Sequence, residues 1–161
     1  MSYAVVYSSK TGNTKMLAEA IRDVLPEEEC LYFGEMNEKA LEADRIYVGF
    51  WTDKGRCSDE AAEFLKTVTN QEIFLFGTAG FGGGSDYFDQ ILKKTEKYIP
   101  KTATLTGSYM CQGKMPMSVR QRYEKMTKVP NIQQMIENFD KALSHPDQKD
   151  LENLKEIIKK D

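Results

Sequence analysis

Residues 3–24 read YAVVYSSKTGNTKMLAEAIRDV, and this stretch decides the fold. Tyr3–Tyr7 is a short run of β-forming residues, and residues 12–24 carry an apolar stripe at helical spacing. SSKTGNT, residues 8–14, lies directly between the two. An anion bound to such a loop meets free backbone N–H groups and the positive end of the helix dipole. The stretch therefore predicts a strand, an anion-binding loop and a helix in direct succession.

The loop between strand and helix carries neutral hydrogen-bond donors. Its candidate ligand-binding residues are Ser9, Lys10, Thr11, Gly12, Asn13 and Thr14. Hydroxyl and amide groups can donate to phosphate oxygens, and Gly12 lets the backbone curl close to a ligand. The loop matches neither a Walker loop nor G-x-G-x-x-G, so it favours a single terminal phosphate ester. The alternatives are a plain helix cap and, for Lys10, a solvated surface lysine.

Apolar runs and helical patterns alternate along the next hundred residues. Further strands are predicted at 30–33, 45–50, 73–76 and 103–111, and helices at 37–42, 58–68 and 85–98. Nearly continuous apolar strands are covered on both faces, as in parallel sheets. Five such strands predict an α/β fold with a doubly wound parallel sheet of order 2-1-3-4-5. Extra C-terminal helices are predicted at 118–127, 132–143 and 151–158, within a single domain of residues 1–161.

Two further loops follow the third and fourth strands. The first holds the candidate residues Trp51, Thr52, Asp53 and Gly55, and the second holds Thr78, Ala79, Gly80, Phe81 and Gly82. The only tryptophan of the chain can stack on a planar ring, and a glycine-rich loop lets the backbone approach a ligand edge. In the predicted order, these loops converge with residues 8–14 at the switch point of the sheet. Alternatively, Trp51 caps the core edge and the glycine-rich segment is only a lid or connection.

Residues 9–14, SKTGNT, resemble the flavodoxin phosphate motif [ST]-x-T-G-N-T at every fixed position. The resemblance covers about residues 1–112 and implies FMN as the cofactor, held by the three loops. YAVVYSSKTGNTK and GSYMCQGKMP also resemble the BilS subgroup of flavodoxin-like proteins, which is found beside bilirubin reductases.

The chain departs from the flavodoxin pattern at two places. Flavodoxins usually have a Gly-Asp step directly after the tryptophan, whereas Thr52 and Asp53 follow Trp51 here. Flavodoxins also carry a tyrosine after the fourth strand that stacks on the flavin. That position falls in the glycine run, and neither Phe81 nor Tyr87 has the matching spacing. We therefore expect one face of the flavin to be open to a partner or substrate.

Composition narrows the function further. A net charge of −3 argues against nucleic-acid binding, no apolar stretch is long enough to span a membrane, and three widely spaced cysteines indicate a reducing, cytoplasmic compartment. No residue is a convincing acid–base catalyst. We expect a monomeric FMN-binding electron-transfer protein that works between a reductase and an acceptor enzyme. The alternative is a small NAD(P)H-dependent FMN or quinone reductase. A phosphate-acceptor regulator would need clustered acids after the first strand, where Ser8 and Ser9 stand.

Overall fold

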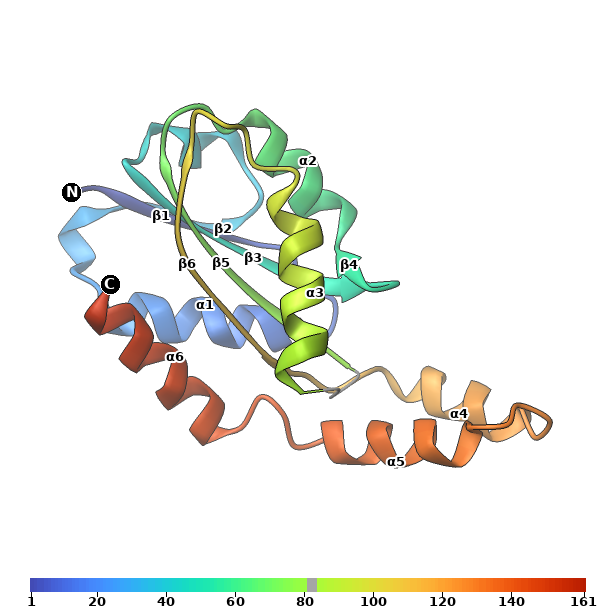
Figure 1. Cartoon of the computed structure of the whole chain (residues 1–161). Coiled ribbons are helices and arrows are strands. Elements are labelled where there is room, and N and C mark those ends of the chain that lie inside the picture. Colours follow the sequence, from blue (N-terminus) through green and yellow to red (C-terminus); the bar gives the residue numbers. More distant parts are fainter. Residues whose placement is uncertain (81–83) are drawn as a thin grey trace.

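The computed structural model describes residues 1–80 and 84–161, and it has a parallel sheet between two layers of helices (Figure 1). The strands are β1 (Tyr3–Tyr7), β2 (Cys30–Glu35), β3 (Arg45–Asp53), β4 (Arg56–Cys57), β5 (Glu72–Ala79) and β6 (Thr104–Gln112). The helices are α1 (Asn13–Val24), α2 (Asp59–Thr67), α3 (Ser85–Glu96), α4 (Met117–Lys125), α5 (Ile132–Ala142) and α6 (Gln148–Lys160). Single 3₁₀ turns cover Glu27–Glu29 and Glu38–Glu42.

The parallel strands follow the order β2-β1-β3-β5-β6, which confirms the predicted arrangement. β1, β3 and β5 are buried on both faces, as their apolar runs require. Leu17 and Ile21 of α1 pack with Leu154 of α6 on one face of the sheet. Leu65 of α2 and Ile91 of α3 pack on the other face. Because β1, β3 and β5 are parallel and adjacent in this order, their carboxyl ends lie side by side at one end of the sheet.

The segment after Trp51 is a correction to the prediction of a loop. β3 continues through Thr52 and Asp53 and then turns back into β4, with Asp53 opposite Arg56. Lys54 and Gly55 have φ of 54° and 81°, the positive values that a two-residue type I′ hairpin turn needs. The tight turn lets the strand extend beyond its last buried residue.

One smaller prediction also meets a different structure. Residues 37–42 were predicted to form a helix, but they form the short 3₁₀ turn Glu38–Glu42. The predicted C-terminal helices are present. α4 and α5 lie against one another and project beyond the sheet at its carboxyl end (Figure 1). Within the described residues, no helix has both the length and the apolar character needed to cross a bilayer.

Candidate functional site

A cavity of about 170 Å³ lies at the carboxyl ends of the central strands. It is lined by Lys10, Thr11, Asn13, Trp51, Thr52, Thr78, Gly80, Gly113, Lys114, Met115, Pro116 and Val119. Seven of these twelve residues were candidates from the sequence, and they come from all three predicted loops. The switch point of an α/β sheet thus brings together loops that are far apart in the chain.

The loop after β1 presents unpaired backbone donors. α1 begins at Asn13, and Gly12 before it has a φ of +88°, which glycine adopts at no steric cost. Apart from the neighbouring residues in the chain, no described atom lies within 4 Å of the position that a Cβ on Gly12 would take. Among the described residues, the N–H groups of residues 11–14 have no hydrogen-bond acceptor. These donors and the positive end of the α1 dipole make the loop suitable for an anion.

The side chains of this loop divide into two groups. Thr14 is fully buried, and its Oγ1 donates to the Phe50 carbonyl at 3.1 Å, so it braces the loop from below. The Ser9 hydroxyl accepts a hydrogen bond from the Lys15 N–H at 3.4 Å. Thr11 and Asn13 line the cavity. The Asn13 Oδ1 atom is buried without a hydrogen-bond partner among the described residues.

The Trp51 indole is held in place from two sides. Its Nε1 donates to the Ser8 hydroxyl at 3.1 Å, and that hydroxyl donates to the Glu60 carboxylate at 3.3 Å. The Lys10 ammonium lies over the indole, 5.1 Å from the ring centroid, in a cation–π contact. Thr52, the next residue, donates from Oγ1 to the Thr78 carbonyl at 2.8 Å. The indole therefore stands at the cavity wall in a defined orientation.

Several predicted candidates do not line the cavity. Asp53 and Gly55 belong to the hairpin beyond Trp51, and Ala79 is buried in the core. Ser9, Gly12 and Thr14 support the loop without lining the cavity. Phe81 and Gly82 lie outside the described residues. Tyr87 packs against Phe88 and the core on α3, and it does not line this cavity.

Part of the cavity wall comes from a segment outside the three predicted loops. Residues 113–119 enter α4, and five of them line the cavity. The Lys114 carbonyl accepts hydrogen bonds from Asn13 Nδ2 at 2.8 Å and from Thr11 Oγ1 at 3.3 Å. The Lys114 N–H donates to the His145 carbonyl at 3.0 Å. In the sequence, the flexible side chains of Met115 and Met117 suit either a soft cover beside a ring or simple packing.

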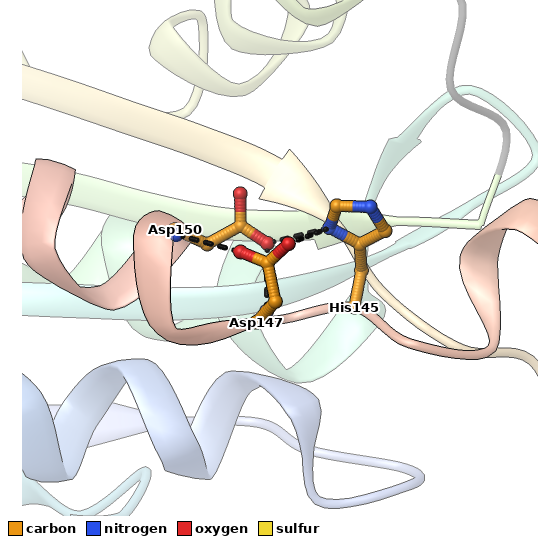
Figure 2. Close-up of side chains that lie close together, drawn as sticks. All are labelled: His145, Asp147 and Asp150. Atoms are coloured by element: carbon orange, nitrogen blue, oxygen red, sulfur yellow. Dashed lines mark hydrogen bonds and ion pairs between the residues drawn. The ribbon is translucent and has the colours of Figure 1, made fainter.

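One cluster of titratable side chains lies outside this cavity. Figure 2 shows His145, Asp147 and Asp150 around the start of α6. His145 Nδ1 is 2.6 Å from Asp150 Oδ2, and the two aspartates form a reciprocal capping box at the helix. The backbone N–H of Asp150 lowers the pKa of the Asp147 carboxyl. Capping of α6 accounts for these contacts, so we assign no ligand to the cluster.

The cysteines offer no reactive group to the site. Burial raises the pKa values of the Cys57 and Cys111 thiols, which keeps both protonated at neutral pH. All three cysteines of the chain are free. No cysteine, histidine or carboxylate is among the described residues that line the cavity.

Comparisons with known proteins agree with this geometry. A family model described as Flavodoxin domain matches residues 4–159, so the chain belongs to the flavodoxin family. A flavodoxin-like domain-containing protein BilS from Clostridium symbiosum (strain WAL-14163) is 40% identical over 94% of this chain and 90% of its own length. A protein of the same name from Clostridioides difficile (strain CD3) is 34% identical, with the same coverage. The resemblance to the BilS subgroup is confirmed.

Solved structures show the same fold at low sequence identity. Oxidised flavodoxin 2 from Bacillus cereus has a TM-score of 0.62 and 17% identity, covering 98% of this chain and 95% of that one. A short-chain flavodoxin associated with a non-canonical PDU bacterial microcompartment has a TM-score of 0.56 and 17% identity, covering 88% and 97%. Both results confirm the α/β flavodoxin fold.

Membership of the flavodoxin family makes FMN the cofactor, and the loop after β1 fits its phosphate. The cavity is small for the whole molecule, because pockets for such ligands hold ~300–1,000 Å³. Two flexible side chains border it: Lys10 lies over Trp51, and Met115 lies where a Cβ at Gly80 would stand. Both side chains are long and flexible, so the volume of the cavity can change as they move.

Proposed function

We propose that this protein is an electron carrier that takes electrons from a reductase and passes them to an acceptor enzyme. One observation carries the proposal: the described lining has a Trp and two lysines but no carboxylate, imidazole or thiol. Such a lining can hold a cofactor and offers no conventional acid–base pair for substrate chemistry. The flavin supplies the redox chemistry.

The residues of the chain have separate parts in this proposal. The N–H groups of residues 11–14 and the side chains of Thr11 and Asn13 hold the phosphate, with Lys10 and Lys114 adding positive charge nearby. The Trp51 indole lies along the flavin ring and limits access of water to one face. The residues that lie outside the cavity or outside the described chain, among them Asp53, Gly55, Phe81 and Gly82, stay candidates for contact with the flavin.

The proposal extends to the setting in which the carrier works. It acts as a monomer and as one domain, with two protein partners and neither nucleic acid nor membrane. Three free cysteines fit a reducing cytoplasm.

A small NAD(P)H-dependent FMN or quinone reductase is the second candidate. The wall of residues 113–119 favours it, because a wall beside the flavin could border a nicotinamide or a quinone. Anaerobic mixing of the FMN-loaded protein with NADPH separates the two. We expect the yellow colour to persist until a flavodoxin reductase is added. Rapid bleaching by NADPH alone would contradict the carrier proposal and support the reductase.

A further inference from the structure

We propose that residues 113–131, the basic arm, dock the carrier onto a partner protein whose redox centre is surrounded by acidic side chains. This proposal rests on the proposed electron-carrier function. The basic arm holds five Lys or Arg side chains and one Glu, a net charge of +4 in a chain whose net charge is −3. The remainder of the chain is therefore acidic, and the molecule is strongly polarised.

The charge of the basic arm is mostly uncompensated. Arg120 is held internally by Asp140 of α5 and by Glu124. Lys114, Arg122, Lys125 and Lys128 are exposed, and none has an ion-pair partner among the described residues. Four exposed cations without ion-pair partners, against one Glu within the arm, produce a local positive field that attracts an acidic surface.

The position of the basic arm links this field to the flavin site. Lys114, Met115, Pro116 and Val119 line the cavity, and α4 continues outward from them beyond the sheet (Figure 1). A protein that contacts α4 therefore lies beside the cavity mouth. Electron transfer needs this proximity and no covalent contact.

The surface of the arm is suited to a short-lived complex. Its interior is fixed by Tyr123, which is buried, and by the Arg120–Asp140 pair at 2.9 Å. Met117 is 55% exposed on the outside, and methionine adapts to different apolar surfaces. Charge that steers, with an adaptable apolar contact, favours rapid association without tight binding.

The test compares two charge-matched variants of the FMN-loaded chain. R122Q/K125Q/K128Q removes three cations from the arm. K97Q/K101Q/K160Q removes three exposed cations from the other end of the sheet, near the starts of β6 and β3. The protein is photoreduced, and its second-order rate of electron transfer is measured with an acidic probe, the soluble haem domain of cytochrome b5. Horse cytochrome c, which is basic, is the second probe.

At low salt, we expect the arm variant to transfer electrons to cytochrome b5 about tenfold more slowly than the wild type. The rate of the control variant should fall by less than about twofold. The difference between the two variants should disappear at high salt, because the Debye length falls to ~3 Å at 1 M. With cytochrome c, the arm variant should be no slower than wild type. Equal losses in the two variants, or no loss in either, would overturn the proposal.

Docking can also be measured by NMR, independently of electron transfer. Amide shifts of the ¹⁵N-labelled protein on addition of cytochrome b5 should cluster at residues 114–128. If reduced protein transfers no electrons but these shifts appear, the carrier function fails and the docking surface stands. Shifts elsewhere would contradict the basic arm. Binding to phosphatidylserine vesicles that depends on the arm, with no binding to cytochrome b5, would also contradict the proposal. Self-association of the wild type that the arm variant abolishes would contradict it as well.

Discussion

Residues 8–14 and residues 113–119 border the same cavity, but the first segment can be predicted from the sequence and the second cannot. The loop after β1 is built locally, from a strand, a glycine at φ +88° and the first turn of α1. Residues 113–119 reach the site from about one hundred residues later in the chain, and hydrogen bonds to the Lys114 backbone hold them there. A local motif forms the loop after β1, and a tertiary contact fixes the cavity wall beside it.

The contrast explains how the two regions should respond to mutation. Side chains of the loop differ in whether they brace the fold or face the ligand. Within residues 113–119, we expect substitutions to have their main effect at Gly113, where the backbone comes close to Asn13. Stability and FMN affinity, measured separately, therefore distinguish the parts of the site.

The largest effect is expected at Gly113. A Cβ there would lie 2.5 Å from Asn13 Nδ2 and 3.1 Å from Thr78 Cβ, both on well-packed side chains. Gly113→Ala should lower the free energy of unfolding by about 3 kcal/mol, the upper range for overpacking, and weaken FMN binding. Gly80→Ala is the matched control, because the three atoms nearest to its Cβ all belong to the flexible Met115 side chain. Urea denaturation of both variants checks this, and equal losses would show that the wall is not packed as described.

A smaller effect separates two threonines of the phosphate loop. Thr14→Val leaves the buried Phe50 carbonyl without its hydroxyl donor, so we expect a loss of about 1–3 kcal/mol in stability. Thr11→Val removes a donor facing the cavity together with its exposed hydrogen bond to the Lys114 carbonyl, so we expect a similar loss in FMN binding and a smaller loss in stability than for Thr14→Val. Calorimetric titration and thermal unfolding of both variants test the division. It fails if Thr11→Val destabilises the apoprotein more than Thr14→Val does.

The Trp51 indole gives a spectroscopic test of the second loop. Because it is the only tryptophan, FMN binding should quench the emission of the protein strongly as the ring comes against it. Lys10→Gln removes the cation over the indole and should leave this quenching intact. Unchanged emission at saturating FMN would place the indole away from the flavin.

The smallest effect is expected at the base of the basic arm. The Arg120 guanidinium, by hydrogen bonding, lowers the pKa of the Asp140 carboxyl from its ordinary value of 3.8. A lowered pKa stabilises the fold above the ordinary value and ceases to do so as pH falls through the lowered one. Arg120→Gln should therefore reduce stability slightly at pH 7, with the difference vanishing in acid. A difference that grows below pH about 3 would contradict this sign.

The sequence predicted the sheet order and the succession of strand, loop and helix at residues 3–24, because local patterns mark each element and the strand count fits one common order. Apolar runs marked the strands that are buried on both faces, and SKTGNT marked the loop. It missed the β4 hairpin, since the two-residue turn at Lys54 and Gly55 has a weak local signal. It missed Lys114 as a wall residue because the contact uses the backbone carbonyl, to which the side-chain identity contributes nothing. Thr14 was predicted to contact phosphate, but its place below the loop depends on the Phe50 carbonyl of another strand.

The central claim is that the loop after β1 holds the phosphate of FMN. Titration of the apoprotein with FMN and with riboflavin, which lacks only the phosphate, tests it most directly. We expect riboflavin to bind at least about tenfold more weakly, because charge-assisted hydrogen bonds to the phosphate contribute about 1.5–3 kcal/mol each. Thr11→Val should narrow this difference by weakening FMN alone. Equal affinity of the wild-type protein for FMN and riboflavin would contradict the phosphate site and the account built on it.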